Sequence, residues 1–223
     1  MSDKLKYELL PKDYENFDLY CKIILVGDSG VGKTCIISRY ISGAFDHNSR
    51  STNGASYASK ILTFENLNKT ISLDIWDTAG QEKYKSLTKF FYKDAAVAIL
   101  VYDITQKDSF ANMKNYWYEQ LQEFGSKKII LGVAGNKCDM YDKEEVSEAD
   151  AREFAEKVGA FFEITSAKNN TGITDLFMNA ANRFVDPNYK GSSEEGKEQT
   201  DQKDGKIKLD DNQLKNVKKR RCC

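Results

Sequence analysis

The stretch at residues 25–34, LVGDSGVGKT, constrains this chain more than any other part of its sequence. It has the pattern G-x-x-x-x-G-K-[ST], with Gly27, Gly32, Lys33 and Thr34 in the required places, and it follows a short apolar run typical of a strand. Glycines let backbone N–H groups converge on an anion, and a helix beginning near Gly32 would add its N-terminal dipole. The loop therefore predicts a phosphate site, with a glycine-rich strand-to-helix turn as the alternative, and it does not by itself separate ATP from GTP.

Each side chain of this loop has an expected task. Lys33 would neutralise the β- and γ-phosphates, and the hydroxyl of Thr34 would ligate Mg²⁺, a cation that prefers oxygen ligands. We expect the loop and the start of the helix to contact the nucleotide through Ser29, Gly30, Val31, Gly32, Lys33, Thr34 and Cys35.

Apolar runs and amphipathic stretches alternate after this loop, which predicts a mostly parallel α/β sheet. The runs 57–64 and 70–76 predict an antiparallel hairpin, and the wholly apolar run 95–102 predicts a central strand. A later helix should be capped by Asp108 and carry an apolar stripe that includes Trp117. Ser147 and Asp150 form a capping-box signal for a further helix, which Gly159 should close. The fold class we predict is α/β, with a six-stranded, mostly parallel sheet that has one antiparallel strand and is flanked by helices.

Composition divides the chain into three parts. Residues 1–18 form an irregular N-terminal extension of mixed charge, residues 19–185 hold the predicted domain, and residues 186–223 contain one aromatic and many polar residues, which predicts a disordered tail. The net charge of −1 argues against a general nucleic-acid-binding surface, so no nucleic acid is expected as a partner. No apolar run is long enough to span a bilayer, so a cytosolic chain is the default expectation.

Further candidate residues follow the hairpin, where ligands of an open α/β sheet usually lie. Asp77 could hold Mg²⁺ through water, the N–H of Gly80 could meet a γ-phosphate, and Gln81 could orient an attacking water. A strong base is not needed, because positioning and charge stabilisation supply most of the rate in phosphoryl transfer. An ordinary strand-to-loop turn is the alternative.

The run Asn136, Lys137, Cys138, Asp139 indicates which nucleotide base the chain binds. Guanine presents N1–H and N2–H₂ side by side, and the carboxylate of Asp139 can accept both, whereas adenine has no such donor pair. Asn136 and the stem of Lys137 would tie this loop to the phosphate loop and cover the ring. The alternative for these four residues is a surface turn.

Two other segments should complete a base pocket. One is the run of Ser166, Ala167 and Lys168, in which the N–H of Ala167 could meet guanine O6. Phe45, just after the first helix, could stack on the base.

These motifs, in this order and spacing, resemble the Ras superfamily of small GTPases: GDSGVGKT, Thr52, WDTAGQE, NKCD and TSAK. The pieces STNGASY, KYKSLT, FYKDA and VYDIT resemble the Rab branch, and FDHN, GAS, AGNKCD and a double-cysteine end are similar to early-endosomal Rabs. The resemblance implies a P-loop NTPase G domain that binds GTP or GDP with Mg²⁺.

The resemblance also implies roles for matched residues. Thr52 would ligate Mg²⁺ and contact the γ-phosphate in the GTP state alone, so residues 45–57 would be switch I and residues 78–93 switch II. Catalysis would involve Gln81, Lys33 and Thr52. No arginine finger stands at a matched position in the switches, so an accelerating partner is expected to supply one.

Tyr57, Trp76 and Phe91 match an aromatic triad that faces effectors in Rabs, with hairpin packing as the alternative for Trp76. Two positions depart from the family pattern: Asn53 stands for an isoleucine and Asp94 for a glycine. An amide in switch I should weaken an apolar effector contact, whereas neither departure touches the nucleotide.

The end of the chain, KKRRCC, does not fit the C-a-a-X prenylation motif. By resemblance, Cys222 and Cys223 would each carry a geranylgeranyl group delivered by an escort protein, and two lipids with a basic cluster would anchor the chain to anionic leaflets. The alternative is a soluble terminus with two free thiols. The implied location is the cytoplasmic face of endosomal or vesicular membranes, with a cytosolic GDP-bound pool.

The sequence thus predicts a monomeric Rab-type GTPase that acts as a membrane-recruited switch in vesicular traffic. Its implied partners are a GTPase-activating protein, an exchange factor, a GDP-dissociation inhibitor or escort protein, and effectors. One alternative is a GTP-binding scaffold with negligible hydrolysis, and another is an ATP-using phosphotransferase.

Overall fold

The structure is a computed structural model that describes residues 7–9, 17–46, 52, 55–78, 90–189 and 191, with the backbone alone for residues 7–9 and 66. Its strands are β1 (Tyr7–Leu9), β2 (Leu19–Val26), β3 (Ala55–Phe64), β4 (Lys69–Thr78), β5 (Val97–Asp103), β6 (Ile130–Asn136) and β7 (Phe161–Ile164). Its α-helices are α1 (Lys33–Ser42), α3 (Lys107–Asn112), α4 (Tyr118–Phe124), α5 (Glu148–Val158) and α6 (Ile173–Val185). Short helices of other types are η1 (Glu65–Leu67), η3 (Met113–Trp117) and η4 (Cys138–Lys143).

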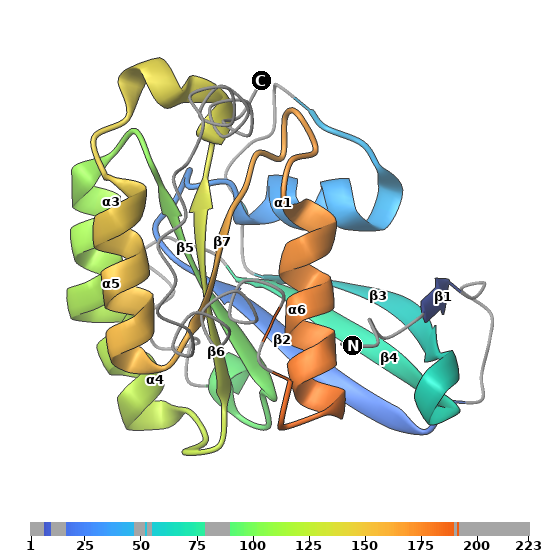
Figure 1. The fold of residues 1–223 in the computed structure, drawn as a ribbon. Coiled ribbons are helices and arrows are strands. Elements are labelled where there is room, and N and C mark those ends of the chain that lie inside the picture. Colours follow the sequence, from blue (N-terminus) through green and yellow to red (C-terminus); the bar gives the residue numbers. More distant parts are fainter. Residues whose placement is uncertain are drawn as a thin grey trace, which may run out of the picture.

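The described strands form one sheet in the order β1-β3-β4-β2-β5-β6-β7 (Figure 1). β4, β2, β5, β6 and β7 pair in parallel and β3 runs antiparallel to β4, so the predicted six-stranded arrangement is confirmed for β2 to β7. β1 adds a seventh strand at the edge, paired with β3 from Tyr7↔Phe64 to Leu9↔Leu62. The extension expected to be irregular therefore contributes a strand, which is too short to show a periodic pattern in sequence.

Helices cover both faces of the sheet, and each face has its own apolar core (Figure 1). α1 and α6 pack on one face, and α3, η3, α4 and α5 pack on the other. Because successive side chains of a strand point to opposite faces, Ile23 of β2 enters the first core and Ile24 enters the second. β5 is buried at every position, as predicted for the central strand.

The helix ends agree in part with the sequence prediction. The hydroxyl of Ser147 accepts a hydrogen bond from the N–H of Asp150 at 3.1 Å and caps α5, which closes at Gly159 with φ 69°. The predicted cap of α3 was wrong: Gln106 is the N-cap residue, and Asp108 lies in the first turn. Its charge there still favours the helix, because the N-terminal end of the dipole is positive.

Candidate functional site: a nucleotide-binding edge

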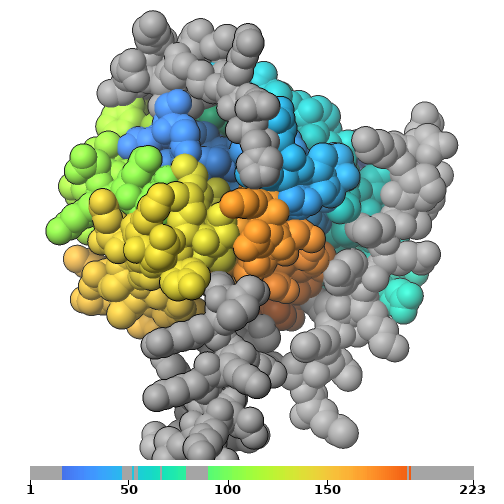
Figure 2. All heavy atoms as spheres, turned by 90° about the horizontal axis from the view of Figure 1, so that it is seen from above, coloured from blue at the N-terminus to red at the C-terminus, as the bar shows by residue number. Residues whose placement is uncertain are grey.

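The loops after β2, β6 and β7 and the end of β4 meet at the carboxyl edge of the sheet, where ligands of open α/β folds bind. Figure 2 looks onto this edge: the blue segment at the start of α1 adjoins the yellow segment of η4 and the orange segment that follows β7. Sequence motifs that lie more than a hundred residues apart thus form one surface.

Two glycines of the phosphate loop allow the rest of the site to approach it. Gly27 has φ 151° and Gly32 has φ 99°, in the region that favours glycine. A Cβ on Gly27 would lie 2.2 Å from the carbonyl oxygen of Val101, and one on Gly32 would lie 2.3 Å from Nδ2 of Asn136. Strand β5 and the base loop therefore pack directly against this loop.

The ammonium group of Lys33 is buried at the centre of the phosphate loop. Its Nζ donates to the carbonyl oxygens of Gly27 at 2.7 Å and Asp28 at 2.8 Å, and the residue is 6% exposed. Burial lowers the pKa of Lys33 to about 8, against the opposing influence of Asp77 and Asp28. A cation with so little water around it is a strong site for phosphate oxygens.

Three oxygen-bearing side chains converge beside Lys33. The hydroxyl of Thr34 donates to Oδ2 of Asp77 at 2.6 Å, that of Thr52 donates to the same atom at 3.1 Å, and the two hydroxyl oxygens lie 2.6 Å apart. Oδ1 of Asp77 is buried and has no hydrogen-bond partner among the described residues. Burial raises the pKa of Asp77, although hydrogen bonds from the two threonines and the charge of Lys33 oppose the shift.

This cluster fits a hard cation. The described residues hold no group of three or more His, Cys, Asp or Glu side chains suited to a metal, so a metal site of that kind is not found in this part of the chain. Two hydroxyls, one carboxylate and the oxygens of a phosphate are, however, the oxygen ligands that Mg²⁺ takes in nucleotide sites.

Asn136 joins the base loop to the phosphate loop. Its Nδ2 donates to the carbonyl oxygen of Val31 at 2.8 Å, and its Oδ1 accepts from the hydroxyl of Thr165 at 3.2 Å. Asn136, Val31 and Thr165 are all buried, so these bonds are shielded from water. The predicted tie between the two loops is therefore present.

Asp139 lies where the segment after β7 can hold its carboxylate. The hydroxyl of Ser166 donates to Oδ1 at 2.6 Å, and Nζ of Lys168 lies 3.8 Å from Oδ2. Ser166 is itself fixed, because its hydroxyl accepts from the N–H of Asn169 at 3.0 Å. The carboxylate is thus held in one orientation by the segment after β7.

Lys137 adopts φ 68° and places its Nζ 2.6 Å from Oδ2 of Asp103, which is fully buried at the end of β5. An ion pair with a buried partner holds the lysine stem in one direction across the site. Asp103 was not singled out in the sequence, although it ends a buried strand just as Asp77 does.

Arg39, near the end of α1, connects the segment after β7 to the segment that follows α1. Its Nε donates to the carbonyl oxygen of Ala167 at 2.7 Å, its Nη2 to that of Lys168 at 3.0 Å, and its Nη1 to that of Gly43. The guanidinium also lies over the ring of Phe45, 5.8 Å from its centre. No local pattern indicates this role, since the contacts join residues 128 and 129 positions apart.

Several predicted residues lie outside the described part of the chain. Gly80, Gln81 and Asn53 belong to the switch segments, and Cys222 and Cys223 end the tail. Their roles remain predictions from the sequence.

Comparison with known proteins decides the family. A sequence model of the Ras family matches residues 22–186. The chain belongs to the Ras family.

Ras-related protein Rab-31 of Rattus norvegicus is 42% identical over 205 residues, which cover 91% of this chain and 96% of that protein. Ras-related protein Rab-22A of Homo sapiens is 43% identical over 164 residues, 73% of this chain and 82% of the relative. Ras-related protein Rab5 of Nicotiana tabacum is 42% identical over 167 residues, 75% and 82% of the two chains.

Within the Ras family this chain is therefore of the Rab type, as the motifs predicted. Ras-family proteins are GTPases that bind guanine nucleotide, so this chain is a GTPase and the ATP-using alternative is set aside. No helix in the described ranges is both long and apolar enough to cross a membrane.

Tyr57, Trp76 and Phe91, the residues that the sequence matches to an aromatic triad, form a row. The ring centres of Tyr57 and Trp76 are 5.3 Å apart, and those of Trp76 and Phe91 are 6.0 Å apart. Nζ of Lys22 lies 5.4 Å from the centre of the Trp76 ring. Tyr57 is 54% exposed, whereas Trp76 is half-buried against the core, so the row presents both an accessible ring and a packed one.

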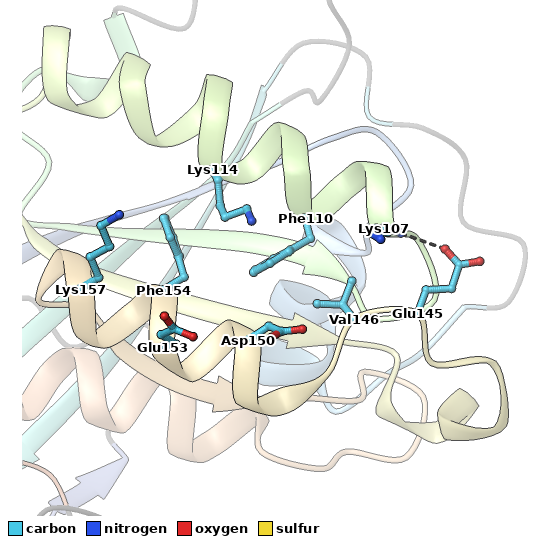
Figure 3. A pocket seen from close by; sticks show the side chains of 9 residues that line it. All are labelled: Lys107, Phe110, Lys114, Glu145, Val146, Asp150, Glu153, Phe154 and Lys157. Carbon is cyan, nitrogen blue, oxygen red and sulfur yellow. Dashed lines mark hydrogen bonds between the residues drawn. The ribbon is translucent and has the colours of Figure 1, made fainter.

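A surface hollow of about 350 Å³ lies away from this edge, between α3 and α5 (Figure 3). Phe110 and Phe154 face each other across it, and positively charged lysines and negatively charged carboxylates surround them, among them Lys114 and Asp150. None of its lining residues belongs to the nucleotide-binding edge, so the hollow is no part of the site.

Proposed function

We propose that this Rab-type GTPase binds GTP and GDP with Mg²⁺ and switches between two states according to the γ-phosphate. The observation that carries the proposal is the convergence of Thr34, Thr52 and Asp77 beside the buried ammonium of Lys33. Thr52 belongs to the first switch segment, and Thr34 and Asp77 belong to the rigid domain. A ligand held by all three would therefore fix the switch segment in place.

In this proposal, the residues around the nucleotide base select guanine. Asp139 accepts the paired N–H groups of guanine, Ala167 offers its N–H to O6, and Phe45 and the Lys137 stem cover the ring. Arg39 supports the proposal, because its bonds to the carbonyls of Ala167 and Lys168 fix the segment that presents this N–H. Ser29, Gly30, Val31, Gly32 and Cys35 complete the phosphate contacts through the loop and the start of α1.

Hydrolysis needs a positioned water and stabilised charge. Gln81 orients the water, the N–H of Gly80 contacts the γ-phosphate, and Lys33 balances the negative charge that develops on the β- and γ-phosphates. Mg²⁺, when bound, would supply further positive charge next to the phosphate oxygens. We expect slow hydrolysis by the chain alone and acceleration by an activating protein that brings an arginine.

Single-turnover hydrolysis of GTP by the purified full chain tests this proposal. A Rab-directed activating domain should accelerate the wild type, and Gln81→Leu should abolish most of that acceleration while GDP affinity stays the same. A chain with no acceleration and no loss in the Gln81→Leu variant would instead be a scaffold that only recruits partners.

We further propose that the domain spans residues 19–185, that residues 186–223 form a tail, and that Cys222 and Cys223 carry the two prenyl groups. Two lipid chains give stable anchoring where a single one gives marginal binding. The monomeric chain would act on the cytoplasmic face of endosomal or vesicular membranes and return to the cytosol in its GDP form with a dissociation inhibitor. Exchange factors and effectors would act through the switches and the row of Tyr57, Trp76 and Phe91.

Replacement of both cysteines by serine tests the anchoring. The double variant should bind GDP as the wild type does, yet it should be found in the cytosol in cell fractionation. A double variant that stays on membranes would remove the lipid anchors from the proposal.

A further inference from the structure

The phosphate loop contains a carboxylate, which is unexpected next to a binding site for a polyanion. Asp28 directly follows Gly27, and its charge would repel phosphate groups if it faced them. The structure shows where this charge goes: Oδ1 accepts a hydrogen bond from Nε1 of Trp117 at 2.7 Å, and Oδ2 accepts one from Nδ2 of Asn112 at 2.8 Å. Both oxygens are therefore held by the helix that packs beside the loop.

The two donors reach the same carboxylate because the helix changes type between them. In a regular α-helix, residues five positions apart point about 140° away from each other. Between Asn112 and Trp117 the chain forms the π-turn η3, in which the N–H of Tyr118 bonds to the carbonyl oxygen of Met113, five residues back. Such a turn brings residues five apart onto one side, and π-turns inside helices frequently occur at functional sites.

Asp28 is also held through its main chain. Its carbonyl oxygen accepts a hydrogen bond from Nζ of Lys33 at 2.8 Å, while its side chain is bound by Trp117 and Asn112. The peptide group is planar and trans, so a fixed direction of this carbonyl also fixes the direction of the N–H of Ser29, which points the opposite way. That N–H belongs to the set that the nucleotide proposal assigns to phosphate binding.

We infer that Asp28 is a positioning residue of the nucleotide site, anchored by Asn112 and Trp117 so that the phosphate loop presents its N–H groups and turns its own charge aside. The inference rests on the proposed nucleotide binding and adds to it a link from the loop to η3. It gives Trp117 a polar task in addition to its place in the apolar core, where it is buried. Loss of the anchor should loosen the loop and speed nucleotide release.

Release of a fluorescent GDP analogue from the full chain in Mg²⁺, chased with excess GDP, measures this effect. Trp117→Phe removes the indole N–H and keeps an aromatic ring, and it should speed release about tenfold, as expected for one hydrogen bond to a charged group. Tyr118→Phe is the matched control, because it removes a polar group one position further along, from a ring that packs on Phe154, and it should release GDP at the wild-type rate. Equal rates for Trp117→Phe and the wild type would overturn the inference.

A second variant, Asp28→Ala, distinguishes anchoring from electrostatics by the direction in which it changes the GDP release rate. Asp28→Ala removes a negative charge beside the phosphates, so electrostatics alone would slow release, whereas loss of the anchor speeds it. We expect faster release, and we expect Asp28→Ala with Trp117→Phe to release GDP no faster than Asp28→Ala alone, since both changes remove one interaction. Slower release by Asp28→Ala, or additive effects in the double variant, would overturn the inference.

Thermal unfolding of the same GDP-loaded proteins distinguishes positioning from general stability. A role in packing alone would lower the melting temperature of Trp117→Phe and leave the release rate at 25 °C unchanged, which would also overturn the inference. If the wild-type chain retains no GDP, the proposed nucleotide binding itself fails. If the wild type retains GDP and the variants release it at the same rate, the anchoring role alone fails.

Discussion

The side-chain amide of Asn136 donates a hydrogen bond to the carbonyl oxygen of Val31 at 2.8 Å, across 105 positions of the chain. The segment proposed to select the base and the loop proposed to hold the phosphates are thereby parts of one buried network. Any change at Asn136 should therefore affect phosphate binding as well as base recognition.

We expect Asn136→Ala to weaken GDP binding at least about tenfold and to lower the free energy of unfolding by roughly 1–3 kcal/mol, because it removes the hydrogen bonds that Asn136 makes with the buried Val31 carbonyl and the buried Thr165 hydroxyl. GDP titration and urea unfolding measure the two effects. Asn179→Ala is the matched control. The side-chain amide of Asn179 in α6 donates a hydrogen bond to Glu163 of β7, so this variant should lower stability and leave GDP affinity unchanged. Unchanged GDP affinity in Asn136→Ala would show that the network does not support the site.

Asp139 should account for the preference for guanine over hypoxanthine, which lacks the exocyclic amino group. The wild type should bind GDP at least about tenfold more tightly than IDP, since a charge-assisted hydrogen bond is lost with IDP. In Asp139→Ala the two affinities should become nearly equal, whereas Asp142→Ala, an exposed change in η4, should keep the wild-type ratio. An Asp139→Ala variant that still prefers GDP would assign this selectivity to other groups.

Removal of Mg²⁺ should speed GDP release, because the site then loses the cation that the Thr34 hydroxyl is proposed to bind. Chelation with EDTA should accelerate release from the wild type about tenfold or more, because a ligand bound to the folded site stabilises it by mass action. Thr34→Val keeps the shape of the side chain without its hydroxyl, so it should release GDP quickly even in Mg²⁺, and Thr34→Ser should behave as the wild type does. Equal sensitivity of all three proteins to EDTA would place the cation elsewhere.

The lowered pKa of Lys33 predicts how GDP affinity depends on pH. Burial holds this pKa at about 8 in the absence of nucleotide, and neighbouring phosphates would raise it, so binding takes up a proton when the pH exceeds about 8. GDP affinity should accordingly be constant below that pH and fall as the pH rises from 8 to 9. Calorimetry in buffers of different ionisation enthalpy counts the protons. Lys33→Arg stays charged throughout this range, so its affinity should not show the same fall.

Asp94 stands where the Rab pattern has glycine, and the structure gives the reason for the glycine: Asp94 has φ 59°. This left-handed conformation costs an ordinary residue about 1 kcal/mol. Asp94→Gly should therefore raise the free energy of unfolding by roughly 0.5–1 kcal/mol in urea and leave GDP release unchanged. Asp142→Gly, at a position without positive φ, should lower stability instead, because glycine loses more backbone freedom on folding. A loss of stability in Asp94→Gly would mean that the carboxylate itself stabilises the turn.

Local sequence patterns predicted the features that short segments determine by themselves. The phosphate loop, the apolar run that forms most of β5, the hairpin of β3 and β4, and the Ser147 cap with Gly159 each follow from residue types within one short stretch of the chain. The order of these elements then indicated which strand ends carry the ligands, because parallel strands place their carboxyl ends at one edge.

Packing alone decided the contacts between distant segments. The bonds of Asp28 to Asn112 and Trp117, of Arg39 to the segment after β7, and of Lys137 to Asp103 join residues whose separation in sequence carries no periodic signal. The π-turn that aligns Asn112 with Trp117 is likewise indistinguishable from an α-helix in its apolar pattern. Hydrophobic burial is non-directional and specifies which faces meet, whereas hydrogen bonds need partners within about 3 Å, and those distances exist only once the helices have docked on the sheet.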